Sequence, residues 1–265
     1  MQATQPTLDL SPLAVLTVAG LDQTIQIDFD GLAANRRTLP RARRESLTTK
    51  IASRASALVG RQLDRLDAFA RRTLDIVGAG AAITALSPLF VAAAAAIKLE
   101  SRGPVFFVQE RVGEKGCRFP MFKFRSMRTT AEAERAAVVE AEGAEGDVRF
   151  KSRRDPRVTR VGRLLRRFSI DELPQLFNVL RGEMSLVGPR PPIPAEVAQY
   201  SASDWRRLDV RPGLTCIWQV SGRADIPFEG QVLLDVEYIR TQSLLTDLRI
   251  LFATVPAVLS GKGAY

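Results

Sequence analysis

The residues of this chain with the clearest chemical potential are two adjacent carboxylates, Asp171 and Glu172. An aspartate carboxylate can attack phosphorus to form an acyl phosphate, and its oxygens can also ligate Mg²⁺. Adjacent residues of a helix point about 100° apart, so the two carboxylates would approach one site from different angles. The pair therefore offers a nucleophile and a metal ligand for phosphoryl chemistry.

The same stretch also has the pattern of a helix start. Ser169 and Glu172 have the spacing of a capping box, and Pro174 is ordinary in a first helical turn. A helix N-terminus offers backbone N–H groups to a bound phosphate, so capping and catalysis are compatible. From these residues alone both interpretations stay open.

Four basic residues are candidates for contacting phosphate. Lys123 and Arg125 alternate with aromatic residues on an expected strand, so they share one face and could contact phosphate or uridine. Arg190 is held between two prolines, which lowers the entropy lost in a bidentate phosphate contact. Arg211 stands before Pro212 and a glycine, at a turn. A solvated strand face, a proline-rich connector and a plain turn are the alternatives.

The composition limits which other chemistry is possible. The chain has 265 residues, 46% of them hydrophobic, enough for a sizeable core. Its net charge of +9 implies an acidic partner, which could be nucleic acid, anionic lipid or a phosphorylated substrate. Histidine is absent and there are only 2 cysteines, which excludes a histidine-based triad and leaves too few ligands for zinc.

An uncharged apolar segment, residues 76–97, precedes these candidates. As a helix with about 1.5 Å rise per residue it would reach about 33 Å, enough to cross a hydrocarbon core. Ser87 and Pro88 lie in its middle, where proline should kink or break the helix. Basic residues flank both ends, so there is no charge asymmetry. We expect a re-entrant membrane helix at about residues 73–99, with both ends on one side; a buried core helix is the alternative.

The remaining pattern predicts a mixed α/β fold that is mainly helical. Residues 104–112 and 117–125 are aromatic and β-branched runs that predict a β-hairpin. Residues 160–168 have an apolar face and an arginine-rich face, typical of an interfacial amphipathic helix or of a helix packed on the core. A second apolar stripe at residues 244–255 favours core packing.

The first 60 residues read as a separate, variable N-terminal extension that we expect to be partly disordered. Residues 25–29 could form one strand. The basic run at residues 36–44 is most simply a solvated linker, with contact to anionic lipid headgroups as the sharper alternative.

Residues 169–191 resemble the signature of the bacterial sugar transferase family. These are monotopic phosphoglycosyl transferases, which load a sugar 1-phosphate from a nucleotide sugar onto a polyprenyl phosphate. The resemblance extends over about residues 66–265, the expected transferase domain. Its further matches are the helix break at Ser87 and Pro88 and the motifs at residues 123–127, 155–156, 189–191 and 211–215.

The resemblance implies roles for the candidate residues. Asp171 would be the nucleophile and a ligand of Mg²⁺, with Glu172 as its partner. Lys123, Arg125, Arg190 and Arg211 would bind substrate. The substrates would be a UDP-hexose and undecaprenyl phosphate, and UMP would be released.

The closing block of the chain looks like the branch that transfers glucose or galactose 1-phosphate to initiate exopolysaccharide or O-antigen synthesis. We therefore expect a protein of the bacterial inner membrane, with its active site on the cytoplasmic face, in contact with anionic phospholipid and not with nucleic acid. Self-association stays open. The alternative classes are a non-enzymatic basic membrane-binding adaptor and a different phosphotransferase with the same carboxylates.

Overall fold

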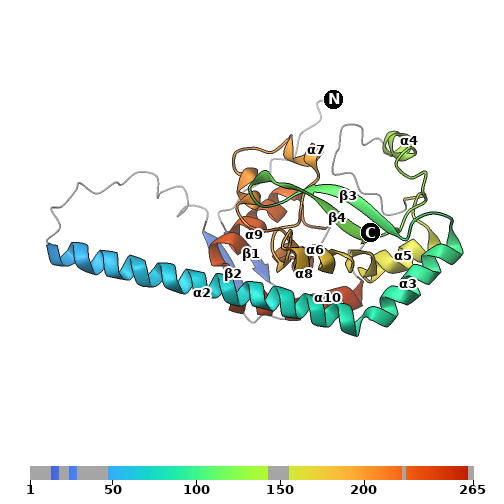
Figure 1. Ribbon diagram of the computed structural model, residues 1–265. Helices are drawn as coiled ribbons and strands as arrows, with labels where there is room; N and C mark the ends of the chain where they lie inside the picture. The colour runs from blue at the N-terminus through green and yellow to red at the C-terminus, as the bar shows by residue number, and fades with distance from the viewer. Residues whose placement is uncertain (1–12, 18–23, 29–46, 143–154, 223–224, 262–265) are drawn as a thin grey trace, which may run out of the picture. The chain divides into compact units, whose positions relative to one another are not determined.

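The computed structural model describes residues 13–17, 24–28, 47–142, 155–222 and 225–261. The chain divides into two compact units, residues 1–61 and 62–265. The first contains an antiparallel pair of strands, β1 (Leu13–Thr17) and β2 (Thr24–Asp28), labelled in Figure 1. The strand predicted at residues 25–29 is confirmed as β2, whereas the basic run at residues 36–44 lies outside the described residues.

The predicted helix break is confirmed. One residue, Leu86, separates helix α2 (Leu47–Ala85) from α3 (Ser87–Glu100), and the two axes differ by 60°. Pro88 lies in the first turn of α3, where its missing N–H leaves no hydrogen bond unmade. The proline therefore starts a new helix in a new direction.

The uncharged segment of α2 and α3, residues 76–97, has apolar side chains on both its buried and its exposed sides. Ala79, Ala93 and Ile97 are buried, whereas Val77 and Val91 are exposed. Within the described ranges, no single helix is both long and apolar enough to cross a bilayer; residues 62–85 and 87–100 meet that requirement only as a bent pair.

The predicted hairpin is confirmed. Strands β3 (Phe106–Val112) and β4 (Arg118–Phe124) pair antiparallel, with Phe106 opposite Phe124. The turn contains a short 3₁₀ helix, Glu114–Gly116, in which Lys115 has a φ of 56°. Phe119 and Met121 of β4 reach the main core, and Phe124 reaches a second core beneath α3.

The apolar face of helix α5 (Arg160–Arg167) is partly packed against the protein and partly exposed. Val161 and Leu165 pack into the second core, but Leu164 is 56% exposed. The start of the helix is tied to the end of α3, because Glu100 accepts hydrogen bonds from the backbone N–H groups of Arg160 and Val161 at 2.7 and 3.1 Å.

The main core includes side chains of α2, β4, a short parallel sheet and three of the later helices. Strand β5 (Ser185–Val187) pairs with β6 (Gly213–Thr215), a pairing that the sequence analysis missed. The helices are α4 (Arg135–Ala141), α6 (Gln175–Arg181), α7 (Pro194–Val197), α8 (Ile217–Ser221), α9 (Phe228–Thr241) and α10 (Leu244–Ser260). Short 3₁₀ helices cover Ile170–Glu172 and Asp204–Leu208.

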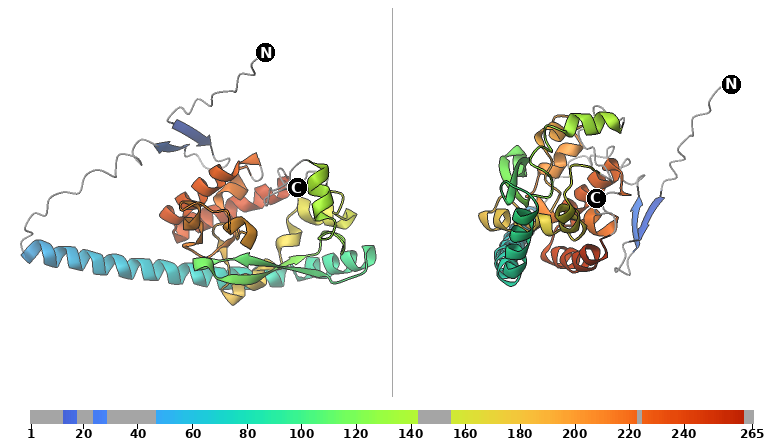
Figure 2. Two further views of the ribbon diagram at one scale, coloured as in Figure 1. Left: turned by 90° about the horizontal axis from the view of Figure 1, so that it is seen from above. Right: turned by 90° about the vertical axis from the view of Figure 1, so that its right-hand side faces the viewer.

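Helix α10 confirms in part the expectation of core packing for residues 244–255, because Ile250 and Leu251 pack in the main core. It lies beside α2 in both Figure 1 and Figure 2, and the backbone N–H of Leu244 donates to Asp67 of α2 at 2.9 Å. Ile250 is buried in the main core, but Phe252 and Val255 are 76% and 58% exposed. Helical periodicity identified an apolar face without showing what covers it.

Candidate active site

The two carboxylates lie on the 3₁₀ helix Ile170–Glu172, directly before α6. Ser169 enters this turn in the left-handed region, with a φ of 54°, and its side chain makes no capping hydrogen bond. Pro174 is the N-cap of helix α6, and it also makes no side-chain capping hydrogen bond. The capping-box interpretation is therefore wrong, and the carboxylates have other partners.

Glu172 is held by two cations from different elements. Its Oε1 accepts hydrogen bonds from Lys123 Nζ of β4 at 3.0 Å and from Arg190 Nη1, just after β5, at 3.2 Å. Burial opposes ionisation of Glu172, but the charges and hydrogen bonds of the two cations outweigh it and hold the pKa of Glu172 well below its usual range. Glu172 is thus a fixed anion.

Asp171 differs from its neighbour. Its side chain is only 8% exposed, and among the described residues no group donates a hydrogen bond to its carboxylate. Burial, and then the negative charge of Glu172, raise the pKa of Asp171, while the charges of Lys123, Arg166 and Arg190 oppose the rise. A desolvated carboxylate without a hydrogen-bond partner is suited to act as a nucleophile.

Arg166 is the site residue that the sequence analysis missed. It lies on α5, donates from Nε to Ser126 Oγ at 3.0 Å, and its charge acts on Asp171. The sequence signal was its place on the arginine-rich face of residues 160–168, but nothing in the sequence distinguished it from the neighbouring arginines.

Asn178 of α6 joins the carboxylates to the strand that carries Lys123. It is fully buried, and its amide accepts from the backbone N–H of Phe122 at 3.1 Å and donates to the carbonyl of Pro120 at 2.7 Å. These two bonds fix β4 against α6 at Pro120 and at Phe122, the residue directly before Lys123. The Lys123–Glu172 pair is therefore set by backbone contacts as well as by charge.

Backbone contacts also fix the segment of Arg190. The carbonyl of Pro191 accepts from Arg111 Nη1 of β3, and the carbonyl of Pro189 accepts from the backbone N–H of Gly213, both at 2.9 Å. Arg111 and Arg190 lie close to one another, beside Pro191 and Gly213. Burial, and then the charge of Arg190, lower the pKa of Arg111 to about 10.

Two of the predicted substrate-binding residues lie elsewhere. Arg125 is buried and donates to the carbonyls of Arg102 and Ser101 and to Ser101 Oγ, each at 2.9 Å, so it holds the end of α3. The expectation that Lys123 and Arg125 share one face and contact the same ligand is therefore contradicted, because Lys123 contacts Glu172 and Arg125 contacts the end of α3. The Nε of Arg211 lies 3.6 Å from Glu114 Oε2 in the hairpin turn, and its side chain is half exposed.

The donor set limits how a metal could be held. The part of the chain that the structure describes has no cluster of three or more histidine, cysteine, aspartate or glutamate side chains placed to hold a metal. Mg²⁺ commonly binds through one or two carboxylates together with substrate phosphates. Asp171, whose oxygens have no hydrogen-bond donor among the described residues, fits such a ligand, whereas Glu172 Oε1 is already occupied by two cations.

Residues 66–261 match the family model described as "Bacterial sugar transferase". The UDP-galactose-lipid carrier transferase of Erwinia amylovora is 44% identical over 200 residues, 74% of this chain and 42% of that protein. The exopolysaccharide production protein ExoY of Sinorhizobium fredii is 41% identical over 198 residues, 74% of this chain and 88% of that protein.

A further relative, the UDP-glucose:undecaprenyl-phosphate glucose-1-phosphate transferase of Caulobacter vibrioides, is 44% identical over 203 residues, 74% of this chain and 72% of that protein. The match thus spans less than half of the Erwinia protein but most of the other two. In all three the aligned part is about three quarters of this chain, and the matched family model includes every candidate site residue described above.

Proposed function

The chain belongs to the bacterial sugar transferase family, and from that premise we propose that it transfers a hexose 1-phosphate from a UDP-sugar to undecaprenyl phosphate. The sugar is glucose or galactose, in keeping with the names of the Caulobacter and Erwinia relatives. The product would initiate an exopolysaccharide or O-antigen.

The observation that carries this proposal is the contrast between the two carboxylates. A carboxylate oxygen of Asp171 attacks the β-phosphorus of the UDP-sugar, and the bond from that phosphorus to the bridging oxygen breaks. UMP leaves with the bridging oxygen and its electron pair, and the hexose phosphate is esterified to Asp171. An oxygen of undecaprenyl phosphate then attacks the same phosphorus and restores the Asp171 carboxylate.

The surrounding residues support this chemistry electrostatically. Arg166, Arg190 and Lys123 all bring positive charge to Asp171, where charge develops on the transferred phosphoryl group. Glu172 keeps Lys123 and Arg190 in place through its two hydrogen bonds. It acts as a partner of the nucleophile by holding the cations that face the phosphates.

Mg²⁺ is the proposed cofactor, held by Asp171 together with the pyrophosphate of the donor. When bound it would neutralise charge on the pyrophosphate oxygens.

We place the reaction at the cytoplasmic face of the inner membrane, with α2 and α3 as a re-entrant helix pair. The exposed apolar side chains of this pair and of α10 support contact with lipid, and so does the 60° bend at the Ser87–Pro88 break. The net charge of +9 suits anionic phospholipid and a phosphorylated substrate.

The test uses the full chain in detergent with Mg²⁺ and either UDP-glucose or UDP-galactose, without acceptor. We expect released UMP and an intact-protein mass increase equal to one hexose phosphate. Asp171→Asn should abolish both, whereas Asp209→Asn, which changes an exposed aspartate outside the site, should leave both unchanged. Near-normal UMP release from Asp171→Asn would overturn the proposal, and binding of vesicles without UMP release would favour a membrane adaptor.

A further inference from the structure

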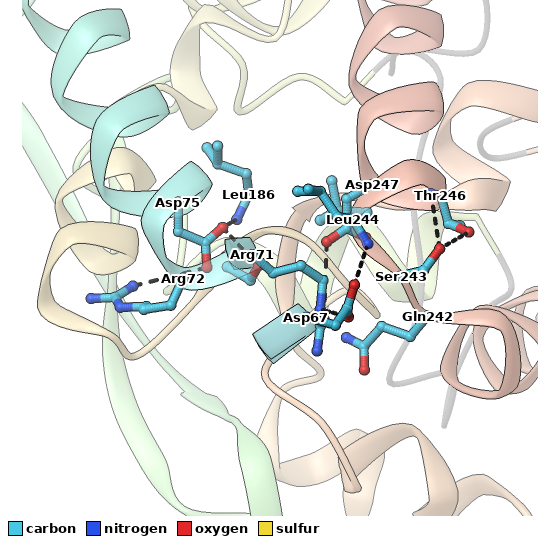
Figure 3. Close-up of polar contacts among 12 residues, drawn as sticks. Asp67, Arg71, Arg72, Asp75, Leu186, Gln242, Ser243, Leu244, Thr246 and Asp247 are labelled. Carbon is cyan, nitrogen blue, oxygen red and sulfur yellow. Dashed lines mark hydrogen bonds and ion pairs between the residues drawn. The ribbon is translucent and has the colours of Figure 1, made fainter. Parts of the chain in front are cut away.

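One turn of α2 contacts the two chain segments that meet at the candidate active site. Arg72 and Asp75 are three residues apart on this turn, and Arg72 Nη1 lies 3.9 Å from Asp75 Oδ2. Figure 3 shows them side by side, with Asp75 directed at the backbone of Leu186. Neither residue belongs to the cluster around Glu172.

Arg72 holds the end of α6. Its Nη1 donates to the carbonyl of Val179 at 2.8 Å, and its Nη2 donates to the carbonyl of Leu180 at 3.0 Å. Gly182, with a φ of 83°, is the C-cap of α6, and a Cβ there would lie 3.4 Å from the Arg72 guanidinium. Because α6 directly follows the turn that carries Asp171 and Glu172, Arg72 fixes the carboxylate side of the site.

Asp75 holds the start of β5. It is 5% exposed, and its Oδ1 accepts from Ser185 Oγ at 2.9 Å and from the backbone N–H of Leu186 at 2.8 Å. Helix and strand pack closely here, since a Cβ on Gly78 would come within 2.8 Å of Leu186 Cδ1. Strand β5 leads through Gly188 and a proline to Arg190, so Asp75 fixes the cation side of the site.

We propose that Arg72 and Asp75 are positioning residues that hold Glu172 and Arg190 at their productive separation. In the Glu172–Arg190 ion pair, Arg190 Nη1 lies 3.2 Å from Glu172 Oε1. This pair joins the segment that leads into α6 to the segment that follows β5, and each segment is held by one of the two α2 side chains. A misplacement of about 1 Å at a reacting centre can cost about 100-fold in rate, even when its cause lies outside the chemistry. The catalytic part of this inference rests on the proposed function.

The same arrangement links the site to the apolar helix pair. Asp75 is the last charged residue before the uncharged segment of residues 76–97. The helical turn of α2 that carries Arg72 and Asp75 therefore leads into the apolar segment and also aligns the candidate active site. A movement of the apolar segment is thus coupled to a movement of the site.

The first arm of the experiment measures the rate constant of adduct formation under saturating UDP-sugar. We expect Asp75→Ala and Arg72→Ala to lower it about tenfold. Asp75→Asn, whose amide oxygen still accepts from Ser185 and Leu186, should stay within about threefold of wild type. The matched control is Asp67→Ala, which removes the acceptor of the Leu244 N–H of α10 and the ion-pair partner of Arg71, and should change the rate less than about twofold.

The second arm separates positioning from general destabilisation by a double-mutant cycle. If Asp75 acts through Arg190, then Asp75→Ala in an Arg190→Lys background should lower the rate less than about threefold further. A full tenfold further loss, which is the additive outcome, would overturn the inference.

The third arm is independent of turnover and of the proposed function. Hydrogen exchange should accelerate in residues 178–182 of Arg72→Ala and in residues 185–190 of Asp75→Ala, with neither effect in Asp67→Ala. Arg72 is partly exposed, so its variant tests the inference even where Asp75→Ala fails to fold. Unchanged exchange in these segments overturns the positioning role. Absence of UMP release from the wild type instead overturns the proposed function, and exchange then still decides the positioning role.

Discussion

Asp171 and Glu172 are adjacent, but only Glu172 is hydrogen-bonded by cations, at 3.0 Å from Lys123 and 3.2 Å from Arg190. Burial, and then the charge of Glu172, raise the pKa of Asp171, whereas the two cations hold the pKa of Glu172 low. On acidification Asp171 therefore takes up a proton first. Because a protonated carboxyl group is a poor nucleophile, the acid limb of the donor step should belong to Asp171.

The sign of this coupling can be tested with two substitutions. The charge of Lys123 lowers the pKa of Asp171, so Lys123→Gln should raise this pKa and move the acid limb to higher pH. The charge of Glu172 raises the pKa of Asp171, so Glu172→Gln should move the limb to lower pH. The measurement is the pH dependence of adduct formation in a single turnover. Lys98→Gln, at an exposed position of α3, is the control, and shifts in the same direction for both test variants would contradict this account.

Arg125 should matter for stability and not for substrate affinity. Its guanidinium satisfies carbonyls at the end of α3, so Arg125→Ala should lower the free energy of unfolding by about 2 kcal/mol. Thermal unfolding in detergent measures this loss, and the KM for the UDP-sugar in the remaining folded protein should be unchanged. Arg190→Ala should show the reverse, a raised KM with a smaller stability loss. A raised KM for the UDP-sugar in Arg125→Ala would contradict this prediction and indicate that Arg125 binds substrate.

Local sequence pattern predicted the elements well and their partners poorly. The hairpin follows from alternating aromatic and β-branched residues, and the helix break follows from Pro88, because both depend on neighbours in the chain. Lys123 and Arg125 look equivalent by the same local rule. They differ because β4 ends between them, so that one side chain reaches Glu172 and the other reaches the carbonyls that end α3.

Long-range pairing explains the other differences. Lys123 and Glu172 are 49 positions apart, and no periodicity links them. Arg166 is held by a hydrogen bond to Ser126 and its charge acts on Asp171, a placement that the arginine-rich pattern of residues 160–168 does not encode. The roles proposed for Asp171 and Glu172 came from resemblance to the family, and the structure adds the physical difference between the two side chains.

Close packing of α5 on Ser126 gives a stability prediction with an internal control. A Cβ added at Gly162 would overlap the carbonyl oxygen of Ser126, and Gly162→Ala should therefore destabilise the fold by about 2 kcal/mol. Gly80→Ala meets no atom within 4 Å on helix α2 and should be neutral or stabilising by up to about 1 kcal/mol. Thermal unfolding of both variants measures the difference in stability. Equal unfolding midpoints would show that α5 can shift to accommodate the added Cβ without loss of stability.

The exposed side chains of α10 give the last prediction. Phe252 is 76% exposed. Leaving such a side chain in water costs about 2 kcal/mol of free energy relative to burying it in apolar surroundings. If α10 lies at the lipid surface, this cost disappears, which is our expectation for the full chain in anionic nanodiscs. An environment-sensitive label on Phe252→Cys, in a Cys117→Ser background, should be quenched by brominated lipid. The same label on Asp209→Cys, at an exposed position of the domain, should be quenched less. Equal access of aqueous iodide to both labels would place α10 in water and confine the lipid contact to α2 and α3.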